Sequence, residues 1–391
     1  MSFIQSVDQT PFADLPAGLV EEVLSRTADV SNSLLESFQE VKQKQQLFHQ
    51  DLVDNDVILH DSSLECITPP TTCAADGSYS IERMLAIDLV AAAAVVVEGL
   101  TPPSEKRFWE QPHYKTYVES EPHSEDTDTV LRSVMLGEEL KLLSTAPHEV
   151  LMMDGTLTLP IIYFNQALSK APEVKGMKCA DRFLDRCNDY LNAYLTILQS
   201  KRSDKNFIGL PKYSTRREIG KELNWPSQYD DRGLLTMILK PGELTKPRIL
   251  QQDQDADGKV TWHLNARKLP SSDIEKTSEI ADSIVQELSK IRVVYYKPRD
   301  WLPALRIEMS SSIANNRARL ATVIHGIKNQ TATPSMLEPY PIYMADRTVK
   351  SLARALPAFR QVATQHISEQ YEGDIGEIYF SMHGYRSESG R

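Results

Sequence analysis

The clearest indication of the fold is the segment His148-Glu149-Val150-Leu151-Met152-Met153-Asp154-Gly155-Thr156-Leu157-Thr158-Leu159-Pro160. Four consecutive apolar residues, Val150 to Met153, end at a carboxylate that a glycine follows. A short apolar run bounded by turn residues is typical of a strand buried on both faces. The aspartate after it lies where side chains leave the core, which in α/β sheets is where ligand sites collect.

A second Asp-Gly pair, Asp76-Gly77-Ser78, precedes this stretch in the chain. Asp-Gly is a common turn pair, because glycine accepts positive φ and aspartate hydrogen-bonds its own backbone. The residues alone leave two interpretations, two ordinary turns or two acids at strand ends that act together. Paired carboxylates suit Mg²⁺ or Mn²⁺, and a two-ion site for phosphodiester cleavage needs at least a third acid. Further candidate acids are Glu138, Glu139 and Asp346.

Composition sets the limits of the prediction. The 391 residues, 41% hydrophobic and 25% charged, suffice for one large or two modest domains. A net charge of -11 argues against indiscriminate nucleic-acid binding but leaves room for a local basic groove. The four cysteines have neither zinc-site spacing nor the density of a secreted disulfide scaffold, so we expect a cytoplasmic protein. The most apolar segment, Met84 to Val97, is too short for a membrane span.

Strands interleaved with helices predict an α/β fold, a mixed sheet flanked by helices. Before it, Leu19 to Leu52 reads as one long or two consecutive amphipathic helices that pack on their own domain or on a second subunit. We therefore expect an N-terminal helical segment, residues 1–60, and a second domain, residues 61–391. Expected elements are a buried strand or two in 84–97, an exposed connection at 119–128, helices at 131–144, 180–199, 274–291, 310–327 and 345–365, and strands at 262–268, 293–297 and 305–309.

Two further motifs bear on function. Asp253 to Gly258 matches the first half of a calcium-binding EF-hand loop, but Leu264 stands where the bidentate glutamate should be, so we interpret the motif as a polar hairpin turn. The chain lacks the phosphate-binding sequence Gly-x-x-x-x-Gly-Lys-Ser/Thr, so any ATP-driven motion must come from a partner. Residues 201–221 are locally basic, which favours either phosphate contacts or a solvated helix face.

The order of motifs between about residues 70 and 360 resembles that of the NurA nuclease family. No single motif is specific to this family, but the order in which the motifs follow one another is. In chain order they are Asp76-Gly77-Ser78, a glutamate-bearing helix, Leu151 to Leu157, Ile208-Gly209-Leu210-Pro211-Lys212-Tyr213-Ser214, Asp231 to Leu235 with Pro241-Gly242-Glu243, Arg306-Ile307-Glu308-Met309, and Tyr340-Pro341 to Ala345-Asp346.

The resemblance implies a ribonuclease H-like fold, a homodimer and Mn²⁺- or Mg²⁺-dependent DNA cleavage of the exonuclease and single-strand endonuclease type. It also implies work with a hexameric HerA-type ATPase in end resection or phage defence. Carried over by position, Asp76 and Asp154 match the family's metal-binding aspartates. The helix glutamate falls on Glu138 or Glu139, and we favour Glu139 because an apolar residue follows it directly. Lys212 matches the family lysine and would face phosphate, with Arg216 and Arg217 as further DNA contacts.

One position departs from the family. The closing motif usually has histidine after alanine, whereas Asp346 stands here. Aspartate can still ligate a hard cation but is less suited to protonating a leaving group, for which His325 and His366 are the possible substitutes. Two other functions compete with the nuclease: a non-catalytic DNA-end adaptor of the ATPase with the same fold, and an unrelated α/β enzyme acting on small phosphate esters. The basic segment disfavours the second.

Overall fold

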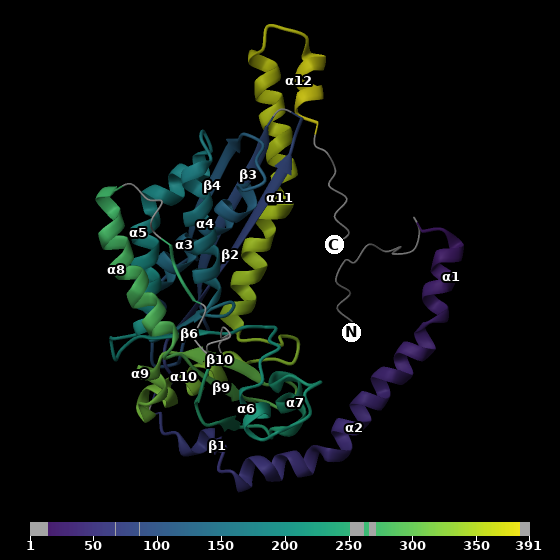
Figure 1. Ribbon diagram of the computed structural model, residues 1–391, viewed down its shortest axis with the longest axis vertical. Coiled ribbons are helices and arrows are strands. Elements are labelled where there is room, and N and C mark those ends of the chain that lie inside the picture. Colours follow the sequence, from purple (N-terminus) through teal and green to yellow (C-terminus); the bar gives the residue numbers. More distant parts are fainter. Residues whose placement is uncertain (1–14, 67, 86, 251–261, 266–270, 384–391) are drawn as a thin grey trace. The chain divides into compact units, whose positions relative to one another are not determined.

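The computed structural model describes residues 15–66, 68–85, 87–250, 262–265 and 271–383 (Figure 1). The chain divides into two compact units, residues up to Asp56 and residues from Val57 onward. In the first unit the amphipathic segment forms two consecutive helices, α1 (Ala17–Ser25) and α2 (Thr27–Asp54). Val41, Phe48 and Leu52 of α2 are buried, whereas most of the apolar residues before them are exposed.

The second unit is built on a mixed sheet. Its strand order is β1-β7-β9-β10-β6-β5-β2-β3-β4, with β8 beside β9. β2, β3 and β4 form an antiparallel meander, and β5 is parallel to both β2 and β6. The strands are β1 (Ile58–His60), β2 (Thr72–Arg83), β3 (Asp88–Glu98), β4 (His113–Glu121), β5 (Val150–Met153), β6 (Asn206–Gly209), β7 (Glu243–Thr245), β8 (Arg248–Ile249), β9 (Arg292–Tyr296) and β10 (Leu305–Met309).

Helices cover both faces of this sheet. α3 packs on one face of β2 and β3, with α5 behind it, and α11 packs on the other face (Figure 1). The helices are α3 (Thr127–Thr145), α4 (Leu159–Lys170), α5 (Lys178–Gln199), α6 (Glu218–Glu222), α7 (Asp231–Ile238), α8 (Ser271–Leu288), α9 (Ser311–Ala314), α10 (Arg317–Gln330), α11 (Tyr340–Gln370) and α12 (Ile375–Ser381), with 3₁₀ turns at Asp61–Ser63 and Ala171–Glu173. Among these residues no helix is both long and apolar enough to cross a bilayer.

The register between β2 and β5 places the two Asp-Gly pairs side by side. The strands pair only from Thr72 opposite Val150 to Ala75 opposite Met153, and the Asp154 amide then donates to the Ala75 carbonyl at 3.1 Å. β2 continues to Arg83 because β3 still pairs with it there. Asp76 therefore lies within a strand, and the expectation that it ends a strand or forms a turn was wrong. The turn at Asp154 is real, since Gly155 has φ of +128°.

Most other expected elements are confirmed, with three corrections. Segment 310–327 forms two helices, because Asn316 caps α10 by accepting hydrogen bonds from the amides of Ala318 and Arg319. The exposed connection at 119–128 is shorter, because Glu121 ends β4 and is buried where it accepts the first amides of α5. Residues 262–265 form no strand; the rest of 262–268 and the motif at 253–258 lie outside the described residues.

Candidate metal site

Three aspartates from three elements converge on one point. Asp76 comes from β2, Asp154 follows β5, and Asp346 lies in the second turn of α11. One carboxylate oxygen of each lies within 4.8 Å of the others. Asp76 and Asp154 are neighbours because β2 and β5 are parallel and in register, whereas Asp346 is brought in by the packing of α11 on β2 and β3. The sequence predicted these three as ligands, and the fold brings them together.

Lys212, which lies beyond the end of β6, reaches into the same cluster. Its Nζ lies 2.8 Å from Asp154 Oδ2, 3.0 Å from Glu338 Oε2 and 3.5 Å from Asp346 Oδ1. Burial alone would lower the pKa of this ammonium group, but the hydrogen bonds and charges of Asp154 and Glu338 raise it above its usual range. Lys212 is therefore held protonated between the acids and offsets their mutual repulsion.

The neighbouring glutamates of α3 have different surroundings. The Glu138 carboxylate accepts hydrogen bonds from Arg182 and Tyr190, both at 2.9 Å, and lies outside the carboxylate cluster. Glu139 points toward β2, where its Oε2 would lie 3.2 Å from a Cβ added to Gly77. The fold thus places Glu139, and not Glu138, beside Asp76.

Burial makes this group of acids reluctant to ionise. Burial, then the charge of Asp154, raises the pKa of Asp76 to about 7. Burial also raises the pKa of Glu139 well above its usual range, with the charges of Asp76 and Asp154 adding to it. The pKa values of Asp154 and Glu338 are raised by burial too, although Lys212 opposes the shift at both. Like-charged carboxylates buried together need a cation for all of them to ionise.

The donor set fits a hard divalent cation. The candidate ligands are all carboxylate oxygens, which Mg²⁺ and Mn²⁺ prefer over nitrogen or sulfur donors. Glu139 Oε1 is buried and has no hydrogen-bond partner among the residues that the structure describes, so it is free to bind an ion. Asp76, Asp154 and Asp346 would hold the ion, and Glu139 lies near enough for the charges of Asp76 and Asp154 to raise its pKa.

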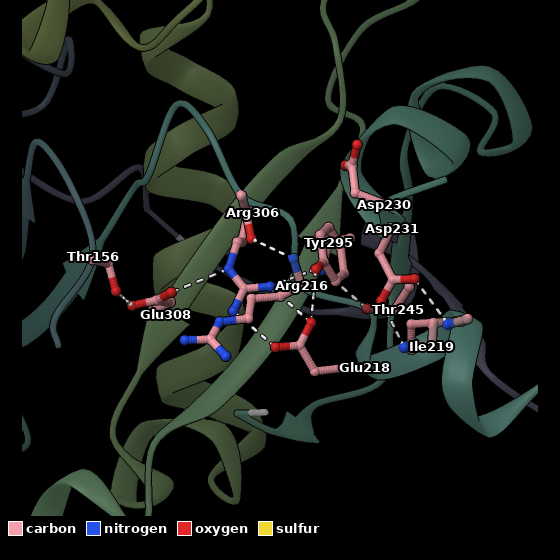
Figure 2. Close-up of polar contacts among 12 residues, drawn as sticks. Thr156, Arg216, Glu218, Ile219, Asp230, Asp231, Thr245, Tyr295, Arg306 and Glu308 are labelled. Atoms are coloured by element: carbon pink, nitrogen blue, oxygen red, sulfur yellow. Dashed lines mark hydrogen bonds and ion pairs between the residues drawn. The ribbon is translucent and has the colours of Figure 1, made fainter. Parts of the chain in front are cut away.

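A buried ionic network holds the turn that carries Asp154 (Figure 2). Glu308 of β10 accepts hydrogen bonds from the Thr156 hydroxyl at 2.6 Å and from the Leu157 amide at 2.9 Å. Its other oxygen accepts from Arg306 Nε at 3.1 Å, and the Arg306 guanidinium donates both terminal nitrogens to Glu218. The Arg-x-Glu motif therefore connects α6 and β10 to the turn after β5.

The basic segment serves more than one purpose. Arg217 donates to the carbonyls of Trp225, Pro226 and Tyr229, so its guanidinium holds a loop together. Lys205 is buried and donates to the Ala146 carbonyl. Arg216 lines a hollow beside Thr156, where Figure 2 shows it next to Arg306. The expectation that Arg216 and Arg217 both face DNA is untested, and the bonds of Arg217 do not favour it.

Three residues that were not predicted as metal ligands also bear on the site: His325, His366 and Glu338. His325 Nε2 donates to the Leu64 carbonyl at 2.7 Å, and His366 is exposed far along α11; neither belongs to the carboxylate cluster. Glu338, which the sequence analysis missed, pairs with Lys212 just before α11. The only local signal for it was an acid directly before Pro339 and the closing helix.

Comparison with known proteins agrees with this geometry. The family model of the NurA domain matches residues 70–351. The crystal structure of the NurA nuclease from Sulfolobus solfataricus is 13% identical in sequence, with a TM-score of 0.58 over 90% of this chain and 98% of that chain. A crystal structure of NurA with manganese is also 13% identical, with a TM-score of 0.50 over 89% of this chain and 99% of that one. None of the curated proteins matches the chain in sequence.

These likenesses establish the fold. The mixed sheet flanked by helices, with helices preceding it, is that of the NurA structures, which confirms the expected α/β fold. The family model spans most of the second unit and includes every residue of the carboxylate cluster. The chain belongs to the NurA family.

Proposed function

We propose that the protein is a metal-dependent DNA nuclease that hydrolyses phosphodiester bonds at the cluster of Asp76, Asp154 and Asp346. The observation that carries the proposal is the convergence of these three acids, with Lys212 beside them, at the end of β5. Membership of the NurA family and likeness to a NurA structure that contains manganese support it.

Each residue has a role in this proposal. Asp76, Asp154 and Asp346 bind the ion, and Glu139 supplies a fourth carboxylate from α3. Bound Mn²⁺ or Mg²⁺ would activate water and stabilise the departing 3′ oxygen. Lys212 would exchange part of its pairing with Asp154 and Asp346 for a phosphate oxygen of the DNA once the ion neutralises these acids. Asp346 acts as an ion ligand and not as the acid that protonates the leaving group.

We further propose the setting in which the enzyme works. The chain has no nucleotide-binding loop of the P-loop type, which supports a separate hexameric HerA-type ATPase that feeds it DNA. Exposed apolar residues of α1 and α2 support a homodimer. The four cysteines are free, which supports a cytoplasmic location. End resection and phage defence are the two roles that such a nuclease and translocase pair would serve.

Replacing one ligand tests the proposal. Asp154→Asn should lower Mn²⁺-dependent cleavage of single-stranded DNA by at least about 100-fold, since even residues that only support metal ligands contribute 10–100-fold. Asp204→Asn removes an exposed acid paired with Arg202 and should leave cleavage unchanged. Full activity in the Asp154 variant would overturn the assignment. A wild-type protein that binds DNA but cleaves none, alone or with the ATPase, would favour the adaptor instead.

A further inference from the structure

A hollow of about 320 Å³ lies against the turn that follows Asp154. Its walls include Thr156 and Thr158 from the turn after β5, and Pro211, Tyr213 and Arg216 from the segment after β6. Thr156 is two residues from Asp154, and Tyr213 is adjacent to Lys212, which pairs with Asp154 at 2.8 Å. Whatever occupies this hollow therefore contacts the two segments that carry Asp154 and Lys212.

Tyr213 is unusual among the aromatic side chains here. It is 93% exposed, although the segment on either side of it is partly buried. It also borders a second hollow of about 260 Å³ that Lys212, Arg232 and Glu338 line, so its ring stands on a ridge between two cavities. An exposed ring next to cations and a cleft is what a protein offers to an unpaired nucleobase, whose face can stack on it.

The other residues that line the hollow also suit a nucleoside. Trp262 adds a second aromatic side chain, Arg216 a guanidinium, and the two threonines add hydroxyls. Aromatic faces bind a base regardless of its identity, while arginine and hydroxyl groups bind sugar and phosphate. The volume is at the small end of ligand pockets, which suits one nucleoside.

The floor of the hollow is rigid. Arg306 and Glu308 line it, and both are almost completely buried and bonded to each other. Glu308 also holds Thr156 and Leu157, so the subsite and the Asp154 turn share one support (Figure 2). A nucleoside seated against this floor would be fixed relative to Asp154.

From these observations we propose that this hollow is a nucleoside subsite that captures one unstacked base of single-stranded DNA, with Tyr213 as its stacking platform. The inference rests on the proposed nuclease function and extends it to the form of the substrate. A base inside a duplex is covered on both faces by its neighbours. The subsite therefore selects a single strand, or a strand end from which one base has been unstacked.

Three variants test the subsite by binding, without cleavage. The probe is a short single-stranded oligonucleotide with 2-aminopurine at one position at a time, in Ca²⁺ or EDTA. Tyr213→Ala should weaken binding by roughly 5- to 150-fold, the range for loss of one base–aromatic stack. It should also abolish the quenching of 2-aminopurine at a single position. Tyr213→Trp should restore both, and Tyr114→Ala, which removes a 63% exposed tyrosine of β4, should change neither.

An abasic substrate separates stacking from a structural effect. Removing the base at the quenched position should weaken binding by wild type as much as Tyr213→Ala does, and should have no further effect on that variant. Unchanged binding by Tyr213→Ala, or an equal loss on every abasic substrate, would overturn the inference. Because binding is measured without cleavage, a protein that stacks the base but does not hydrolyse DNA would refute the nuclease proposal alone.

Discussion

Gly77 allows an acid on one face of the sheet to approach an aspartate on the other. Asp76 points to the face that α11 covers, whereas Glu139 comes from α3 on the opposite face. A Cβ at residue 77 would lie 2.8 Å from Met135 Cγ and 3.2 Å from Glu139 Oε2. The glycine of the first Asp-Gly pair is thus required for close packing, and that of the second for positive φ.

Gly77→Ala should therefore displace Met135 or Glu139 and cost about 1–3 kcal/mol of stability, as overpacking usually does. It should also raise the Mn²⁺ concentration needed for half-maximal cleavage. Thermal unfolding and a Mn²⁺ titration measure the two effects. Gly18→Ala, where an added Cβ meets nothing within 4 Å, is the matched control. Unaltered Mn²⁺ dependence in the Gly77 variant would show that Glu139 needs no such approach.

Replacing each of the two glutamates of α3 with glutamine should have opposite effects on cleavage and on stability. Glu139→Gln should abolish cleavage yet stabilise the metal-free protein, because it removes a buried carboxyl that Asp76 and Asp154 repel. Glu138→Gln should retain cleavage yet cost about 1–3 kcal/mol, because the charge that pairs with Arg182 is lost. Unfolding in EDTA and cleavage in Mn²⁺ measure both. The reverse pattern would assign the ligand to Glu138.

The raised pKa of Asp76 also predicts how stability depends on pH. In the metal-free folded state the Asp76 carboxyl keeps its proton up to about pH 7, whereas an ordinary aspartate loses its proton near pH 3.8. The folded state thus binds more protons, so the Asp76 contribution to stability falls as pH rises from about 4 to 7. Unfolding in EDTA should show a shallower decline for Asp76→Asn than for wild type across this range. Parallel curves for the two proteins would contradict this.

At the scale of elements, β10 and α6 stabilise the turn after β5. Arg306 is 1% exposed and Glu308 2% exposed, so each needs the other's charge. Their bonds to Glu218, Thr156 and Leu157 satisfy the remaining donors and acceptors of the pair. A buried ion pair is tolerated when further hydrogen bonds satisfy its remaining polar atoms, as they do here. Because one of these bonds reaches the turn after β5, the Arg-x-Glu motif positions that turn.

Thr156→Val tests that positioning role without disturbing the ion pair. The change removes one hydroxyl donor to the Glu308 carboxylate and should cost about 1–3 kcal/mol. It should also weaken Mn²⁺ activation, because the Asp154 turn loses part of its support. Thr156→Ser keeps the hydroxyl and should restore Mn²⁺ activation. If valine and serine behave alike in Mn²⁺ titrations, Thr156 does not position Asp154.

At the scale of the whole molecule, the first unit exposes more apolar surface than its own fold explains. Leu34 is 67% exposed and Phe38 55%, on a helix whose buried apolar residues all lie nearer its end. Apolar residues repeated along an exposed helix indicate a surface that a partner covers. The homodimer that we propose would bury them.

Leu34→Glu with Phe38→Glu should therefore shift the protein toward the monomer. Sedimentation velocity over a concentration series measures the change, and the charge-only variant Glu36→Lys on the same helix is the control. The carboxylate cluster belongs to the second unit, so the monomeric variant should keep its Mn²⁺ affinity. A monomeric wild-type protein, or a dimer unaffected by the two substitutions, would refute the proposal.

The helices and strands around the site, and the candidate metal-binding acids, could be predicted from the amino-acid sequence alone. β5, β9, β10, α3 and α5 follow from apolar periodicity, which is a local property of the chain. Asp76 and Asp154 stood out because the motifs occur in the order of a known family. The positive φ at Gly155 also followed from the local Asp-Gly pair.

Which side chains lie close together could not be predicted from local sequence and follows from the packing of distant elements. The position of Asp76 inside β2, the direction of Glu139 toward β2, and the ion pair of Glu338 with Lys212 all depend on contacts between distant elements. Glu138 and Glu139 are adjacent on one helix, and only the side from which β2 packs against α3 distinguishes them. Local sequence specifies a helix and its apolar face, but long-range pairing of strands and helices sets the distance between two carboxylates.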